Sequence, residues 1–186
     1  MKKLIQIVFV FVIGAILTFS SCKEDEDLPI LPKFNFSEVG HLWDYYIIAS
    51  GFKADSFFVR QIGTRSGGYH DLVQSDYGNT YTDTVAWYQT DTEFALMDTN
   101  VKNTLAKIDC KVNDYYVAYD WNDTFVFTVK GLDISTTVPA GTFKCFQVEE
   151  KRNREYLGTF YINKDVGIVR YDMPNDVGYQ LFKVNF

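Results

Sequence analysis

The chain has 186 residues, of which 47% are apolar and 23% are charged, a composition typical of one globular domain with a short additional segment. The formal net charge of −6 disfavours binding to nucleic acid, and the two histidines have no partner at the spacing of a zinc site. An aromatic content of 17% favours strands over helices.

The first 21 residues have the features of a secretion signal. A positively charged start, residues 1–3, precedes an apolar run from Leu4 to Phe19, and two small serines follow. This run is shorter than the roughly 20 residues that a helix needs to cross a bilayer. Residues 1–21 are therefore predicted to be a cleaved signal peptide, and the loss of its two lysines takes the net charge from −6 to −8.

The segment Phe19-Ser20-Ser21-Cys22 resembles the lipobox of bacterial lipoproteins, in which the cysteine becomes lipidated. The resemblance implies that acyl chains such as palmitate on Cys22 anchor the protein in the outer membrane, since several chains together bind stably. The run Lys23–Asp27 resembles the export signal of surface lipoproteins of the Bacteroidota, which implies display at the cell surface. The periplasmic face is the alternative location. Residues 22–33 are predicted to be the lipidated cysteine and an acidic, proline-containing tether.

From residue 34 to residue 186 the sequence predicts a single β domain. Apart from one short helical possibility at Ser37–His41, it consists of strand-like segments between turn residues such as Ser66–Gly68, Tyr77–Asn79 and Val138–Gly141. The thirteen expected strands are Leu42–Ser50, Ser56–Ile62, Tyr69–Ser75, Thr80–Gln89, Thr92–Asp98, Leu105–Val112, Tyr115–Tyr119, Thr124–Lys130, Leu132–Val138, Thr142–Glu149, Glu155–Asn163, Val166–Asp172 and Tyr179–Asn185. Short strands without helices between them exclude a βαβ sheet and predict an all-β antiparallel fold.

The segments Thr137–Phe146 and Val166–Tyr171 resemble the closing half of Bacteroidota lipoproteins, in which a Val-Pro-Ala-Gly-Thr-Phe hairpin precedes a final strand pair. Such proteins are associated with curved sheets of the lipoprotein-localisation-factor type. The resemblance implies a curved antiparallel meander sheet that forms a half-open barrel. A β-sandwich is the alternative that the strand pattern leaves open.

Cys110 and Cys145 remain once Cys22 is lipidated, and an oxidising compartment favours a disulfide between them. The alternative is two buried thiols that never meet. Both cysteines are expected in the middle of strands. A closed loop of about 35 residues would stabilise the domain by roughly 4 kcal/mol.

Aromatic residues are the candidate ligand contacts, and those selected are Trp43, Tyr45, Trp87, Tyr116 and Trp121. Because neighbouring residues of a strand face opposite sides, not all aromatic side chains of the domain can share one core. Some are expected to line a concave surface that binds an apolar or amphipathic small molecule. The alternative is an exposed patch that contacts a protein or a glycan.

No motif predicts a catalytic residue, a cofactor or a metal site. Ser66, His70 and Asp71 lie close in sequence but lack the nucleophile elbow of a hydrolase. The sequence therefore predicts a lipid-anchored, non-enzymatic binding protein of the cell envelope. The oligomeric state is left open.

Overall fold

The computed structural model describes residues 32–76, 82–98 and 101–186. The predicted signal peptide, Cys22 and nearly all of the tether lie outside the described residues, as does the expected turn at Tyr77–Asn79. Residues 33–186 form one compact unit. A unit of roughly 150 residues buries about two-thirds of the surface that its unfolded chain exposes, which is sufficient for it to fold on its own.

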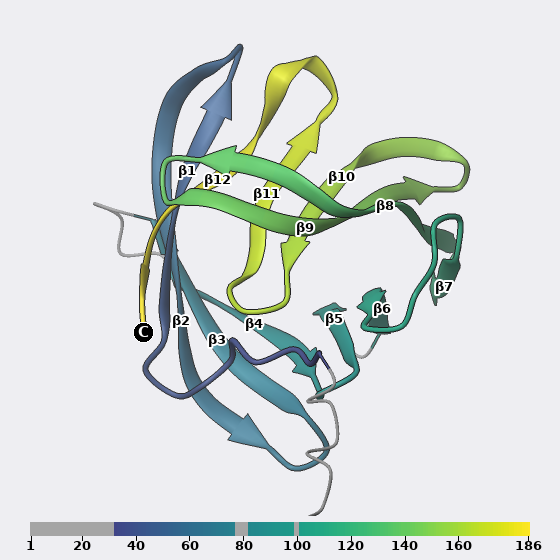
Figure 1. Cartoon of the computed structure of the whole chain (residues 1–186), viewed down its shortest axis with the longest axis horizontal. Helices are drawn as coiled ribbons and strands as arrows, with labels where there is room; N and C mark the ends of the chain where they lie inside the picture. Colours follow the sequence, from purple (N-terminus) through teal and green to yellow (C-terminus); the bar gives the residue numbers. More distant parts are fainter. Residues whose placement is uncertain (1–31, 77–81, 99–100) are drawn as a thin grey trace, which may run out of the picture. The chain divides into compact units, whose positions relative to one another are not determined.

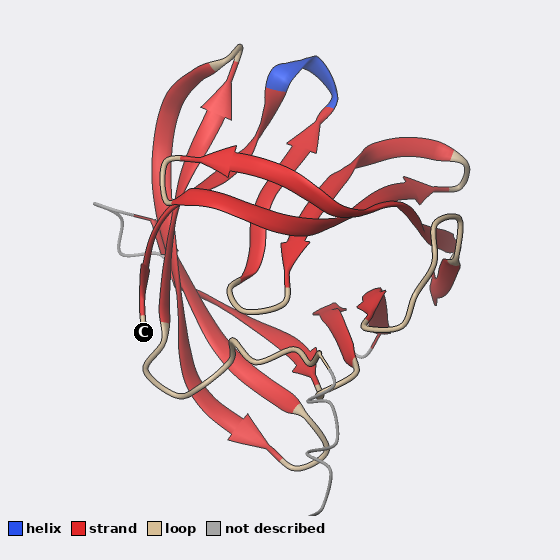
Figure 2. Ribbon diagram, viewed as in Figure 1, coloured by secondary structure: helices blue, strands red, loops and turns tan. Residues whose placement is uncertain are grey.

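The unit consists of twelve strands and one three-residue 3-10 turn (Figure 2). The strands are β1 Leu42–Ala49, β2 Phe52–Arg65, β3 Tyr69–Asp76, β4 Thr82–Gln89, β5 Glu93–Asp98, β6 Val101–Lys107, β7 Tyr115–Asp120, β8 Asp123–Val138, β9 Gly141–Arg152, β10 Glu155–Asn163, β11 Gly167–Met173 and β12 Val177–Asn185, and the turn is η1 Pro174–Asp176. Among the described residues, no helix has the length and hydropathy of a membrane span.

All twelve strands belong to one antiparallel sheet in the order β6-β5-β4-β3-β2-β1-β12-β11-β10-β9-β8-β7. Neighbours in this order are consecutive in sequence, except that β1 pairs with β12. The two edge strands, β6 and β7, contact each other without joining the hydrogen-bonded ladder, so the sheet curls into a nearly closed barrel with an unsealed seam (Figure 1). The predicted curved antiparallel meander is confirmed, and a sandwich of two sheets is excluded.

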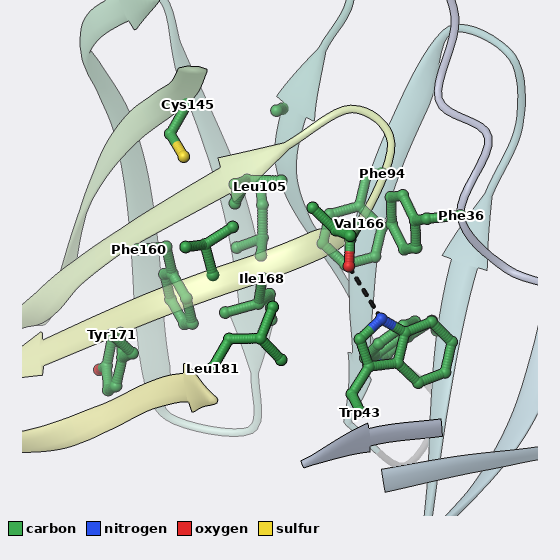
Figure 3. Packing of buried hydrophobic residues seen from close by; sticks show 14 of the residues in the cluster. Phe36, Trp43, Phe94, Leu105, Cys145, Phe160, Val166, Ile168, Tyr171 and Leu181 are labelled. Atoms are coloured by element: carbon green, nitrogen blue, oxygen red, sulfur yellow. Dashed lines mark hydrogen bonds between the residues drawn. The ribbon is translucent and has the colours of Figure 1, made fainter. Parts of the chain in front are cut away.

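Strand β1 illustrates how the sequence selects the inner face of the barrel. Trp43 and Tyr45 are two residues apart, so they share the inner face, and both are buried. Asp44 between them faces the other side of the strand and is buried as well. The Trp43 Nε1–H donates a hydrogen bond to the Val166 carbonyl at 2.8 Å (Figure 3). The Tyr45 hydroxyl donates to the Ile168 carbonyl, also at 2.8 Å. These bonds join β1 to the β10–β11 turn and to β11 through the interior.

The segment before β1 closes one end of the barrel, which we call the plugged end. Phe34 and Phe36 are fully buried there, and the Phe36 ring packs edge-on against Phe94 and Trp87 at centroid distances of 4.9 and 5.7 Å. Backbone N–H groups of residues 34 and 35 donate hydrogen bonds to carbonyls of residues 91 and 164, in the β4–β5 and β10–β11 turns. Residues 33–41 are therefore part of the folded core.

Three local expectations are wrong. The helical possibility at Ser37–His41 is a turn, closed by a hydrogen bond from the His41 N–H to the Glu38 carbonyl. The expected strands Thr124–Lys130 and Leu132–Val138 form one strand, β8, because a bulge around Gly131 and a positive φ of 54° at Asp133 absorb the irregularity and pairing with β9 continues. Strand β6 ends at Lys107, which places Cys110 in the β6–β7 connection.

Candidate functional site

The interior of the barrel contains a cavity of 550 Å³. This volume lies within the range of small-molecule sites, about 300–1,000 Å³. The lining residues are Tyr45, Ile47, Phe57, Val59, Gln74, Val85, Ala86, Trp87, Leu96, Met97, Asp98, Asn103, Phe125, Glu150, Ile168, Met173, Gly178 and Tyr179. Apolar and aromatic side chains therefore make most of the wall.

The cavity extends away from the plugged end. Antiparallel pairing places the β1–β2, β9–β10 and β11–β12 turns together at the other end, which we call the open end. Ile47, Glu150 and Met173 lie within a few residues of these turns, and Trp87 and Ile168 lie deeper in the barrel. The polar lining residues lie near the open end, so the cavity has an apolar floor and a more polar mouth.

An aromatic cluster forms one wall. The Tyr45 and Phe57 rings stack at a centroid distance of 5.1 Å, and Tyr179 meets them edge-on at 5.4 and 5.6 Å. Burial raises the pKa of the Tyr45 and Tyr179 phenols, so both hydroxyl groups stay protonated at neutral pH. The wall thus combines flat apolar surface with uncharged hydroxyl groups.

Glu150 is a half-buried acidic residue beside this cluster. The Tyr171 hydroxyl donates a hydrogen bond to its Oε2 at 2.6 Å. Burial raises the pKa of the Glu150 carboxyl, and this effect outweighs the hydrogen bond from Tyr171 and the attraction of Arg152, both of which lower it. Glu150 is therefore more easily protonated than an exposed glutamate.

Asn103 of β6 presents an acceptor without a donor. Its Oδ1 atom is buried and has no hydrogen-bond partner among the described residues. A buried carbonyl oxygen in this state costs about 1–3 kcal/mol compared with a satisfied one. Together with Gln74, Asp98 and Glu150, it makes the polar part of the lining. A ligand that donates a hydrogen bond would satisfy it.

The five aromatic residues selected from the sequence lie in different environments. Tyr45 and Trp87 line the cavity, and Trp43 lies behind Trp87 at a centroid distance of 4.8 Å. Tyr116 is half-buried on β7, with the Lys107 ammonium 5.7 Å from its ring centroid. Trp121, in the β7–β8 turn, is 99% exposed. The fold brings only Trp43, Tyr45 and Trp87 together.

The β7–β8 hairpin carries a second group of aromatic side chains. Tyr115, Tyr119 and Trp121 are all exposed on this hairpin at the edge of the sheet. Asn153 of the adjacent β9–β10 turn fixes the tip, because its Nδ2 donates to Asp123 Oδ1 at 2.5 Å. It also accepts a hydrogen bond from the Thr124 N–H at 2.9 Å. These two hydrogen bonds therefore fix the hairpin that carries the exposed rings.

Cys110 and Cys145 are both buried free thiols, so the candidate disulfide is not present in the structure. Cys110 lies beside Tyr116 in the β6–β7 connection, and Cys145 lies on β9 beside Thr136. Burial raises the pKa of both thiols, that of Cys145 to about 11, so neither thiol is ionised at neutral pH.

Several cavity residues carry no distinguishing signal in the sequence. Phe57 and Val59 follow the alternation that marks an inner face, so pattern alone selects them once β2 is placed. Glu150 and Asn103 resemble any other polar residue of a strand until the register is known. No group of three or more histidine, cysteine, aspartate or glutamate side chains is arranged to hold a metal ion in the described residues.

The fold and the cavity together define a single-sheet β-barrel with an internal cavity. No protein-family model and no curated protein matches the sequence. The structure is similar to a crystal structure at 2.22 Å of a protein from Bacteroides fragilis NCTC 9343, which is described as exported and as having a YmcC-like fold. The match has a TM-score of 0.60 at 12% identity and covers 83% of this chain and 100% of the other. The two proteins therefore share their fold.

Proposed function

We propose that the protein is a lipid-anchored, non-enzymatic component of the bacterial cell envelope whose barrel binds an apolar or amphipathic small molecule. The observation that carries the proposal is the 550 Å³ cavity with aromatic and aliphatic walls and a polar mouth. A rigid β-barrel with such an interior is a common way to hold one small ligand.

The location rests on two independent arguments. The N-terminal 22 residues have the pattern of a lipoprotein signal and its lipidated cysteine. The structural relative is described as exported, and it comes from the bacterial group whose surface lipoproteins the acidic tether resembles. The first argument favours an outer-membrane anchor through Cys22, and the second favours a location of the β domain outside the cytoplasm.

Native mass spectrometry of residues 33–186, produced in a periplasmic host without added ligand, tests the binding proposal. Val85 lines the cavity on the inner face of β4, and Ala54 of β2 is exposed. We expect the wild type and Ala54→Phe to retain a small molecule and Val85→Phe to lose it, because the larger side chain fills part of the cavity. A ligand-free mass for the wild type, or equal retention by both variants, would contradict the proposal.

A second candidate function is contact with a protein or a glycan through the exposed rings of Tyr115, Tyr119 and Trp121. Exposed aromatic groups on a fixed hairpin supply large contact area at low entropic cost. Glycan-array binding that Trp121→Ala abolishes, and that Val85→Phe leaves intact, would favour this function over the cavity.

A further inference from the structure

The polar groups of the cavity share one chemical character. Gln74, Asp98, Asn103 and Glu150 supply carboxyl and amide groups, and no lysine, arginine or histidine is part of the described lining. Arg152 is a nearby basic group: it is exposed at the end of β9, opposite the lining residue Phe125, and it attracts the Glu150 carboxylate. With Asp98 and Glu150 in the wall, a negatively charged group that enters the cavity meets more acidic groups than basic ones among the described residues.

Two of these groups also favour a particular partner. The buried Oδ1 of Asn103 has no hydrogen-bond partner among the described residues, so it would accept a hydrogen bond from a ligand. Glu150 lies in a part of the wall where burial already disfavours negative charge. A second anion placed beside it would be disfavoured both by desolvation and by repulsion from the carboxylate.

The positions of these groups fix the orientation of a ligand. Trp87, Ile168 and Val59 lie deep in the barrel, and Asp98, Glu150 and Gln74 lie toward the open end. An amphipathic molecule would therefore place its tail on the apolar floor and its head group near the mouth. The head group would contact the carboxyl and amide oxygens near the mouth. The apolar floor would select tails only by their shape.

We propose, on the basis of the function proposed above, that the cavity selects amphiphiles with an uncharged or cationic head group that donates hydrogen bonds, such as an amine or an alcohol. Carboxylate and phosphate head groups are excluded. Their head groups would be repelled by Asp98 and Glu150, and Arg152, which already attracts the Glu150 carboxylate, does not offset both. A site can reject a ligand by such repulsion even when its tail fits as well as that of the preferred ligand.

Four probes with the same tail test the selectivity: dodecylamine, dodecanol, dodecanoate and dodecyl phosphate. Each is titrated calorimetrically into residues 33–186 at pH 7.5, below its micelle concentration or, for dodecanol, below its solubility limit. We expect dodecylamine and dodecanol to bind at least tenfold more tightly than the two anions. Equal or tighter binding of dodecanoate would overturn the head-group assignment and leave the cavity function intact. Failure of all four probes to bind would instead contradict the cavity function.

Charge-changing variants provide an independent readout. Gln74→Lys places a cation at the mouth, and we expect it to improve dodecanoate binding while it weakens dodecylamine binding. Asn103→Leu removes the unpaired acceptor and should reduce the preference for dodecanol over dodecanoate, whereas Asn185→Leu on the exposed end of β12 should not. Unfolding midpoints of all variants check that each one folds. An unchanged head-group order in both Gln74→Lys and Asn103→Leu would overturn the proposal.

Discussion

Phe36 provides the strongest test of the plugged end, because its side chain fills the barrel from a segment that belongs to no strand. It is fully buried, and its ring centroid lies 4.9, 5.7 and 6.4 Å from those of Phe94, Trp87 and Phe34. The Phe36 ring is also 2.8 Å from the position that a Cβ on Gly167 would occupy. Truncation of a phenylalanine in such surroundings costs about 3–5 kcal/mol. We therefore expect Phe36→Ala to lower the free energy of unfolding by about 4 kcal/mol, a large part of the roughly 5–15 kcal/mol available to a domain.

The assay is urea denaturation of residues 33–186, followed by tryptophan fluorescence. The matched control is Phe52→Ala, because Phe52 is 78% exposed at the start of β2 and its loss should change the free energy of unfolding by less than about 0.5 kcal/mol. At the size of this domain, the Phe36 effect corresponds to a fall in Tm of about 8–16 °C. A loss below about 1 kcal/mol for Phe36→Ala would refute the conclusion that this segment is part of the core.

Three further changes test other parts of the structure. Gly178→Ala should lower the free energy of unfolding by about 1–3 kcal/mol, because the added Cβ would lie 2.1 Å from the Tyr171 carbonyl oxygen. Gly63→Ala is the control: its Cβ would meet only ordinary contacts, so the variant should be neutral or stabilising in the same denaturation assay. Trp43→Phe should lower the free energy of unfolding by about 1–3 kcal/mol, because the buried Val166 carbonyl loses its hydrogen-bond donor. An unchanged unfolding midpoint would contradict the hydrogen bond between Trp43 and Val166. Glu150→Gln should become increasingly stabilising relative to wild type as pH rises from about 4 to about 8, and parallel stability curves would contradict the buried carboxyl.

The direction of the Glu150 effect follows from proton linkage. The folded protein raises the pKa of this carboxyl above its ordinary value of 4.5, so the folded state holds the proton more tightly than the unfolded state does. The contribution to stability is present below the unfolded pKa and is lost as pH rises through the folded pKa. Glutamine does not titrate, so its variant keeps stability that the wild type loses.

Much of the fold could be predicted because strand patterns are local. The strand-favouring aromatic and β-branched residues of Leu42–Ala49 and the Pro139-Ala140 turn between β8 and β9 act over a few residues, and the structure has both the strand and the turn. The continuity of β8 could not be predicted, because Lys130-Gly131 reads as a break when the sequence is considered alone. Only pairing with β9 carries the strand through that bulge.

The sequence predicts a concave surface lined by aromatic residues, but not most of the residues that line the cavity. Tyr45 and Trp87 stand out as aromatic residues of strands, and the fold does place them in the lining. Glu150 and Asn103 acquire their roles from register and closure, which bring β6 and β9 to the same interior. Trp121 has the same chemistry as Trp87, and only its position in a turn rather than on an inner face separates the two.

The most direct test of the central claim is methyl and indole NMR of residues 33–186 titrated with dodecanol. The account predicts saturable shifts at the Leu96 and Ile168 methyl groups and at the Trp87 indole, with the Trp121 indole unchanged. Shifts confined to Trp121 and the β7–β8 hairpin, or no shifts in the interior, would contradict the assignment of the barrel cavity as the binding site.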